Sequence, residues 1–243
     1  MLFLAFNMTL APESSAQAIK GYDAIPTGLV PQYPFDSVCP ALTSLYGSMT
    51  DVDGSKREKP HTGVDGGRFG DVVIAPADGK IIAVWETNHG WGPEWSVLIS
   101  HTSRDLNLSE NDVLFLSEFD HLERKDVAHL RKDNRIKRGQ TLGKVRHPGG
   151  NPEFPAETHW EVYEVPLSAE NNSSWIKNKH GGDIWVNQSA RLIDPLYMLS
   201  RNQRKNSRGR VDLTPFTKGN DYSAFRGFTY IFECQGPPSN NGD

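Results

Sequence analysis

Among the residues best suited to chemistry are His61 and Asp65, the first and last residues of the stretch HTGVD. Side chains of an extended chain alternate with a period of two, so this imidazole and this carboxylate lie on one side of it. Gly63, between them, lets the backbone come close to whatever they hold. The pair is a candidate for binding a metal ion, although an ordinary surface turn would explain it as well.

A second group of ionisable residues, Glu157, His159 and Glu161, would share one face of a strand. Burying such a face is costly unless its groups find a partner, and a metal ion is such a partner. With His61 and Asp65, His159 would complete a set of two imidazoles and one carboxylate. Three protein ligands leave the fourth tetrahedral position to water, as in a catalytic zinc site.

The elements that must position these groups are expected to be short strands. From residue 61 to about 165, β-branched and apolar runs alternate with glycine turns, which indicates an antiparallel all-β domain. The expected strands lie in residues 71–76, 80–85, 95–101, 113–119, 141–145 and 159–163. Because no long helices alternate with them, a parallel α/β sheet is not expected.

The flanking regions are patterned more weakly. Asp51–Lys59 is expected to be exposed, residues 166–190 to leave the sheet, and residues 192–199 to form a short closing helix. The predicted organisation is a possible signal peptide at 1–18, an irregular N-terminal arm at 19–60, a functional domain at 61–200 and a C-terminal extension at 201–243.

The composition of the 243 residues, with 37% hydrophobic and 23% charged side chains, is that of a globular protein. The net charge is −4, and a solvated loop explains the basic run Arg201–Arg210 better than nucleic-acid binding does. No stretch approaches the roughly 18 apolar residues of a membrane span. Apolar residues 1–11 and the following Ala16-Gln17-Ala18 favour a signal peptide, although its positively charged start is missing.

The two cysteines, Cys39 and Cys234, are too far apart in sequence to form a CxxC metal site. In an exported protein they would form a disulfide that ties the tail to the N-terminal segment, whereas in a cytosolic protein they would be free thiols. We favour the disulfide, which depends on the prediction of export.

Several motifs follow one another in a recognisable order: His61-x3-Asp65, a strand ending in His101, His121-Leu122, Gly139-Gln140-Thr141-Leu142-Gly143 and His159-Trp160-Glu161. The turns Pro76-Ala77-Asp78-Gly79-Lys80-Ile81 and Gly90-Trp91-Gly92 belong to the same series. Over about residues 45–165 the chain resembles the lysostaphin-like (LytM-type) zinc endopeptidases. The combination is specific, although each motif alone is not.

The resemblance implies the family's mainly antiparallel β-sheet core, a duplicated hybrid motif. It implies that His61, Asp65 and His159 bind Zn²⁺ and that a zinc-bound water attacks the scissile amide. His121 would orient this water or stabilise the tetrahedral intermediate, and Trp91 would line the substrate groove. The implied substrate is a peptide cross-link of bacterial peptidoglycan, and the implied location is periplasmic or extracellular.

Glu157 departs from the family pattern, which commonly has His-x-His in this strand and uses the first histidine in catalysis. Glu157 would then act as the general base on the zinc-bound water. Alternatively the preceding loop is aligned differently, so that His147 supplies a basic group, or the protein has lost activity and only binds.

The other polar residues near these motifs receive structural interpretations. His89, in a glycine-rich turn, is expected to be exposed, and His101 is expected to pack or form a hydrogen bond at its strand end. Glu161 either orients a metal ligand or packs within the sheet.

Two functions of different classes follow. The first is a zinc endopeptidase acting on cell-wall peptides. The second, kept open by Glu157, is a non-catalytic module that binds the wall or regulates another hydrolase. A carrier of phosphoryl groups on histidine is disfavoured, because it needs paired histidines and no His-x3-Asp set. The sequence indicates neither the peptide bond that is cut nor the oligomeric state.

Overall fold

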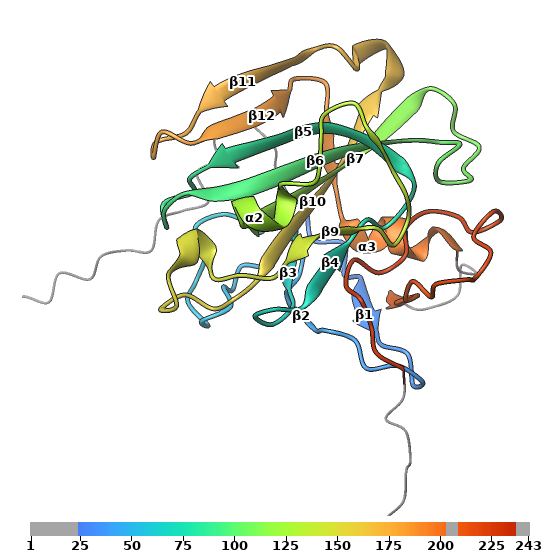
Figure 1. Ribbon diagram of the computed structural model, residues 1–243, viewed down its shortest axis with the longest axis horizontal. Coiled ribbons are helices and arrows are strands. Elements are labelled where there is room, and N and C mark those ends of the chain that lie inside the picture. Colours follow the sequence, from blue (N-terminus) through green and yellow to red (C-terminus); the bar gives the residue numbers. More distant parts are fainter. Residues whose placement is uncertain (1–23, 203–208, 237–243) are drawn as a thin grey trace, which may run out of the picture.

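One mainly antiparallel β-sheet carries the fold in the computed structural model, which describes residues 24–202 and 209–236 (Figure 1). Its strands lie in the order β2-β3-β10-β7-β6-β5-β8, and β13 also pairs with β10. Their bounds are Leu42–Ser44 (β2), Val64–Gly66 (β3), Gly79–Thr87 (β5), Glu94–Thr102 (β6), Val113–Leu122 (β7), Arg135–Ile136 (β8), Thr158–Pro166 (β10) and Arg191–Ile193 (β13). The predicted all-β, antiparallel architecture is therefore confirmed.

The centre of the sheet is covered on both faces. Three consecutive residues of β6, Val97, Leu98 and Ile99, have no exposed surface, although their side chains alternate between the faces. Near the pocket end, the Trp160 ring of β10 stacks on Phe119 of β7, with 6.0 Å between ring centroids. All six runs that were expected to be strands are strands, and four of them lie in this sheet, because β-branched and apolar side chains suit buried strands.

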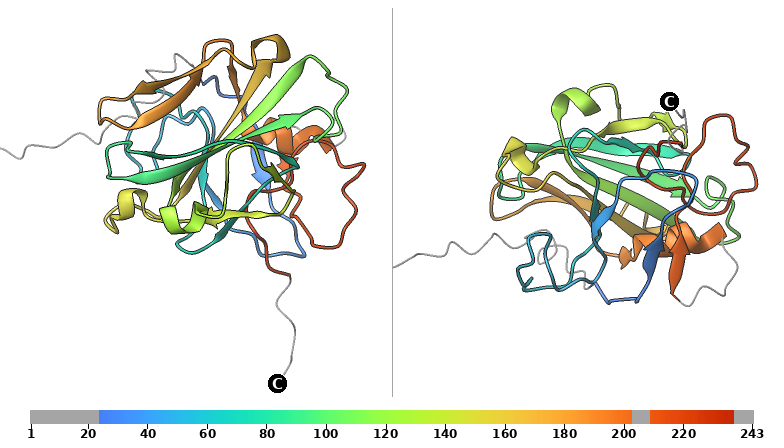
Figure 2. Two further views of the ribbon diagram at one scale, coloured as in Figure 1. Left: turned by 45° about the horizontal axis from the view of Figure 1, so that its top comes forward. Right: turned by 90° about the horizontal axis from the view of Figure 1, so that it is seen from below.

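Smaller strand pairs decorate the main sheet (Figures 1 and 2). They are β4 with β9 (Val72–Ile74 and Thr141–Lys144), β11 with β12 (Ser173–Lys177 and Asp183–Asn187), and the parallel pair β1 with β14 (Val30–Gln32 and Arg210–Asp212). The helical segments are α2 (Arg124–Val127), α3 (Pro195–Leu199), η1 (Pro148–Gly150), η2 (Leu167–Ala169) and η3 (Ser200–Asn202). The excursion expected at 166–190 is thus largely a hairpin, and the expected closing helix is α3.

The two terminal segments are joined to each other and to the core. Cys39 and Cys234 form the favoured disulfide. Residues 228–232 are buried although their sequence is weakly patterned, and the backbone of Ile74 donates a hydrogen bond to Ile231. The C-terminal extension therefore completes the core beside β4.

Three predictions fall outside the described residues. They concern the possible signal peptide at 1–18, most of the basic run 201–210, and residues 237–243 of the expected C-terminal extension. Within the described ranges, no helix has the length and apolarity that crossing a membrane requires.

The disulfide is expected to stabilise the fold, because it closes a loop across a sequence separation of 195 residues. Replacing both Cys39 and Cys234 by serine should lower the free energy of unfolding by roughly 2–5 kcal/mol. Denaturant unfolding of the wild type, with and without reductant, and of the double variant measures this difference. An oxidised wild type no more stable than the double variant would contradict the expectation.

Candidate metal centre

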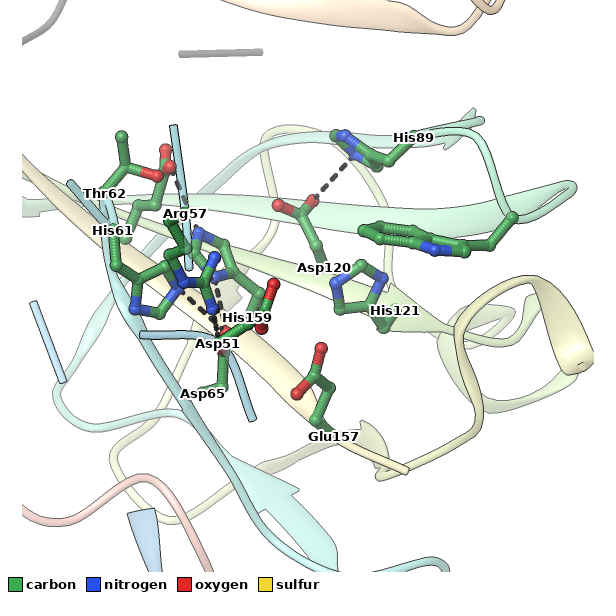
Figure 3. A pocket seen from close by; sticks show the side chains of 12 residues that line it. Asp51, Arg57, His61, Thr62, Asp65, His89, Asp120, His121, Glu157 and His159 are labelled. Atoms are coloured by element: carbon green, nitrogen blue, oxygen red, sulfur yellow. Dashed lines mark hydrogen bonds and ion pairs between the residues drawn. The ribbon is translucent and has the colours of Figure 1, made fainter. Parts of the chain in front are cut away.

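A pocket of about 70 Å³ lies where β7 ends and β10 begins (Figure 3). All the site residues singled out in the sequence line it: His61, Asp65, Trp91, His121, Glu157 and His159. The fold therefore brings together side chains that are spread over about a hundred positions. Their geometry indicates what chemistry each could perform.

Three of these side chains each direct one potential ligand atom to the same point in the pocket. Asp65 of β3 lies directly opposite His159 of β10 in the antiparallel register, and His61 precedes Asp65 by four residues. Asp65 Oδ1 lies 2.7 Å from His159 Nδ1 and 3.1 Å from His61 Nε2. The two ring nitrogens are 3.1 Å apart.

This triangle of atoms fits a zinc ion. Zinc–nitrogen distances of about 2.0–2.1 Å and a tetrahedral arrangement place neighbouring ligand atoms roughly 3.3 Å apart. The observed distances of 2.7–3.1 Å are slightly shorter, as expected for groups that hydrogen-bond to one another. In the part of the chain that the structure describes, no other group of three His, Cys, Asp or Glu residues meets as closely.

Hydrogen bonds on the outer side of each imidazole hold the rings in this orientation. His159 Nε2 lies 3.1 Å from Glu161 Oε1, and the Tyr163 hydroxyl donates to Glu161. His61 Nδ1 lies 3.2 Å from the Leu45 carbonyl oxygen. Because these partners accept hydrogen bonds, the outer nitrogens carry protons, and the inner nitrogens are the ones whose lone pairs a metal would use. The geometry favours the ligand-orienting interpretation of Glu161.

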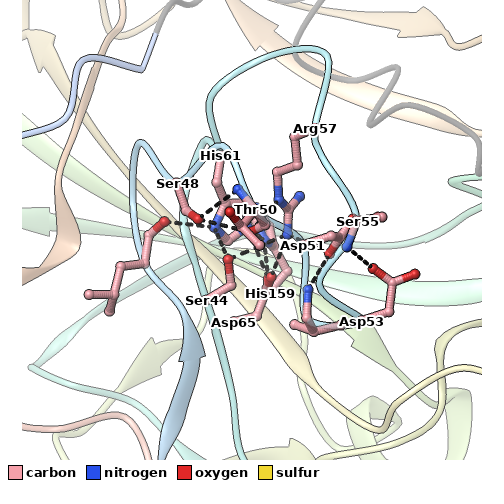
Figure 4. Close-up of polar contacts among 12 residues, drawn as sticks. Ser44, Ser48, Thr50, Asp51, Asp53, Ser55, Arg57, His61, Asp65 and His159 are labelled. Atoms are coloured by element: carbon pink, nitrogen blue, oxygen red, sulfur yellow. Dashed lines mark hydrogen bonds and ion pairs between the residues drawn. The ribbon is translucent and has the colours of Figure 1, made fainter.

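Arg57, which the sequence analysis missed, binds the carboxylate of Asp65 from the arm (Figure 4). Its Nη2 lies 3.2 Å from Asp65 Oδ2 and 2.8 Å from Asp51 Oδ1. The Arg57 side chain is only 14% exposed, so the expectation that Asp51–Lys59 is exposed is wrong at this residue, although residues 53–56 are exposed. No spacing in the sequence predicts the position of Arg57, because the path of the loop that brings it to the pocket depends on tertiary contacts.

The charges of the three candidate ligands are strongly coupled. Burial alone would raise the pKa of Asp65, but the two imidazoles hold it well below its usual range. Burial would lower the pKa of His159, but hydrogen bonds to Asp65 and Glu161 raise it well above its usual range. The pKa of His61 is lowered, chiefly by burial. The positive charge of one proton on His159 therefore balances the negative charge of Asp65, and a bound metal ion would replace that proton.

His121 reaches the pocket from a β-bulge. The β6–β7 register shifts between Trp95↔Leu122 and Val97↔Phe119, so β7 carries one extra residue there. His121 has a φ of 64°, which is uncommon outside glycine. A bulge of this kind turns a side chain away from the alternation of its strand, and here it directs the imidazole into the pocket.

A buried carboxylate, Glu94 of β6, holds the His121 ring. Glu94 Oε2 lies 2.7 Å from His121 Nδ1, and Glu94 is 3% exposed. Burial alone would lower the pKa of His121, but the Glu94 carboxylate raises it to about 9. The sequence analysis missed Glu94, since nothing in the chain links it to a histidine 27 residues later.

Glu157 stands beside His121 on the pocket wall. Its Oε2 is shielded from solvent and has no hydrogen-bond partner among the described residues. Burial, reinforced by the nearby Asp65 carboxylate, raises the pKa of Glu157 to about 8. The side chain thus offers an uncommitted oxygen to a molecule in the pocket.

The structure also places three other histidines for which the sequence analysis stated an expectation. His89 is buried, lines the pocket and lies 4.0 Å from Asp120 Oδ1, so the expectation that it is exposed was wrong. His147 does not line the pocket, because its ring stacks on Phe69 with 5.1 Å between centroids. His101 is fully buried and hydrogen-bonded to Ser117, as expected.

Arg57 is expected to strengthen metal binding, because its guanidinium occupies Asp65 Oδ2 and leaves Oδ1 facing the imidazoles. Replacing Arg57 by alanine should weaken zinc affinity roughly tenfold or more. Competition with a chromogenic chelator measures the dissociation constant. The matched control is Arg191→Ala, which removes an exposed ion pair with Glu164; equal affinities in all three proteins would contradict the assignment.

Zinc affinity is also expected to depend on pH. Since the pKa of His159 is raised well above 6.5 and that of His61 is lowered, binding near neutral pH should displace one proton, from His159. Affinity should therefore rise about tenfold for each unit of pH below the His159 pKa. Titration calorimetry in buffers of different ionisation enthalpy counts the released proton, and a pH-independent affinity would contradict this charge arrangement.

Comparison with known proteins gives likenesses in solved structures only. No protein-family model and no curated protein sequence matches the chain. It is similar to a zinc-containing peptidase from Vibrio cholerae, with 22% identity, 67% of this chain and 37% of that chain covered, and a TM-score of 0.39. It is also similar to Csd3 from Helicobacter pylori, with 21% identity, 67% and 34% covered, and a TM-score of 0.34.

A third likeness is to the catalytic domain of the antimicrobial peptidase lysostaphin from Staphylococcus simulans, with 18% identity, 65% and 91% covered, and a TM-score of 0.33. The chain thus spans little more than a third of the length of the first two proteins.

Proposed function

We propose that this protein is a zinc-dependent endopeptidase that hydrolyses peptide cross-links in bacterial peptidoglycan. The observation that carries the proposal is the convergence of His61 Nε2, Asp65 Oδ1 and His159 Nδ1 within 3.1 Å of one another, in a pocket that also holds His121 and Glu157. These three atoms would hold the metal. Bound zinc would supply a Lewis acid that polarises a carbonyl and lowers the pKa of water.

Glu157 would exchange the proton in this reaction. Its buried Oε2 has no competing hydrogen bond among the described residues and can accept a proton from a water molecule. The ionised form of Glu157, which accepts the proton, is favoured by any cation held on the neighbouring ligands. The same carboxyl group could then return the proton to the leaving amine.

His121 would stabilise negative charge on the substrate. With a pKa raised to about 9 it is a cation at neutral pH, and its Nδ1 is bonded to Glu94. Its Nε2 is therefore a donor for the carbonyl oxygen of a bound peptide, where charge develops during attack. Trp91, whose ring centroid lies 5.4 Å from that of His121, would provide an apolar wall for the peptide.

Peptidoglycan as the substrate is supported by the resemblance of the sequence motifs to lysostaphin-like endopeptidases. Export to the periplasm or the cell exterior is supported by the apolar N-terminal residues and by the disulfide between Cys39 and Cys234, which persists in oxidising compartments. A wall-peptide substrate requires such a location.

One observation favours a second candidate function. Glu157 occupies the place where the resembled family commonly has a catalytic histidine. A chain with an intact ligand set and an altered proton carrier would bind zinc and wall peptide without turnover, as a binding or regulatory module. Zinc retained without release of peptide ends, tested on several wall chemistries, would support this alternative.

The peptidase proposal predicts chelator-sensitive turnover. Purified protein should contain one zinc ion per chain by elemental analysis and should release new amino termini from cross-linked peptidoglycan. His159→Ala should lose both zinc and activity, because it removes one of three ligands. Absence of zinc from the wild type would overturn the ligand assignment of His61, Asp65 and His159.

Glu157→Gln should keep its zinc and lower kcat by about 10²–10⁴-fold, because an amide cannot accept the proton. The matched control is Glu153→Gln, which changes an exposed carboxylate in the preceding loop. Initial rates of peptide release at saturating substrate measure the difference. Full activity of Glu157→Gln would assign proton transfer to another group.

A further inference from the structure

Glu94 does not itself line the pocket, but it contacts three segments next to His121, which does. Its Oε2 lies 2.7 Å from His121 Nδ1 and accepts a hydrogen bond of 3.3 Å from the Gly149 backbone N–H. Its Oε1 lies 3.9 Å from His89 Nε2, on the loop that follows β5. One buried carboxylate thus contacts the end of β7, the turn η1 and the β5–β6 loop.

The backbone around Glu94 is shaped to make this arrangement possible. The β-bulge pairs Trp95 with Leu122, which brings Glu94 at the start of β6 next to His121. Gly149 has a φ of 59°, and a Cβ there would lie 1.9 Å from the Trp91 carbonyl oxygen. Only glycine lets η1 approach this closely, and the approach places the Gly149 N–H on Glu94.

The ionisation of Glu94 fixes the proton on His121. A carboxylate can only accept hydrogen bonds, so His121 Nδ1 must be the donor at 2.7 Å. The ring cannot rotate about its χ2 angle without breaking this charge-assisted bond. The Nε2 atom is therefore the nitrogen that remains for a molecule in the pocket.

We propose that Glu94 is a positioning residue, which holds His121 so that Nε2–H is directed at the carbonyl oxygen of the scissile peptide. This inference rests on the proposed peptidase function. A flexible imidazole would sample other rotamers, whereas the Glu94 carboxylate, 2.7 Å from Nδ1, fixes one orientation. The same negative charge stabilises the protonated imidazolium, which carries its second N–H on Nε2. The effect is expected in the chemical step, since the carbonyl oxygen needs this donor most as its charge develops.

The test compares Glu94→Gln with the wild type and with Glu110→Gln, a control that alters a partly buried carboxylate bonded to Arg201, away from the pocket. Glutamine keeps the shape of Glu94 but removes its charge. The Glu94→Gln variant should lower kcat by about 10²-fold, with KM changed less than about twofold and zinc content unchanged. A kcat within about twofold of the wild type, or an equal loss in Glu110→Gln, would overturn the proposal.

A spectroscopic readout separates this inference from the proposed function. In the wild type, the Nδ1–H proton of His121 should give a downfield NMR resonance, assigned by its absence in His121→Ala. This resonance should move upfield by several ppm or vanish in Glu94→Gln and persist in Glu110→Gln. If the wild type shows this resonance but is inactive, the peptidase proposal is refuted and the Glu94–His121 bond stands. If the resonance persists unchanged in Glu94→Gln, the bond itself is refuted.

Discussion

The antiparallel pairing of β3 with β10 places Asp65 directly opposite His159, and the rest of the pocket is arranged around that pair. A strand shifted by one residue would turn either side chain to the other face, so the register itself determines whether the three ligand atoms meet. The stacked rings of Trp160 and Phe119, on the neighbouring positions of β10 and β7, pack beside this end of the sheet. Core packing and ligand geometry therefore depend on one alignment.

Placing so many ionisable groups in one small pocket is costly unless each has a counterpart. Two pairs of opposite charge meet this requirement: Arg57 lies beside Asp65, and Glu94 lies beside His121. Glu157 is the exception, since its Oε2 has no hydrogen-bond partner within the described ranges and burial raises its pKa to about 8. Groups with a strongly shifted pKa cluster at functional sites, where they supply reactivity at a cost in stability.

Much of this arrangement is visible in the sequence, because strands and ligand pairs are local patterns. Apolar and β-branched runs between glycine turns predicted the six strands. Period-two alternation grouped His61 with Asp65, and the chemistry of a zinc site added His159 to that set. The roles of Arg57 and His89 were missed, since each reaches the pocket from a loop whose path depends on tertiary contacts. Glu94 was missed because it contacts His121 across two strands. The buried segment 228–232 was missed for a related reason: its hydrogen bonds go to distant turns such as that at Pro76, not to a neighbouring hairpin.

The partnership between the two ends of the chain has a consequence for the timing of assembly. The arm that delivers Arg57 is joined through Cys39 to Cys234, and residues 228–232 fill the core beside β4. Synthesis proceeds from the N-terminus, so the arm is made long before its last partner leaves the ribosome. The core beside β4 of a nascent chain would therefore remain incomplete until synthesis is nearly finished.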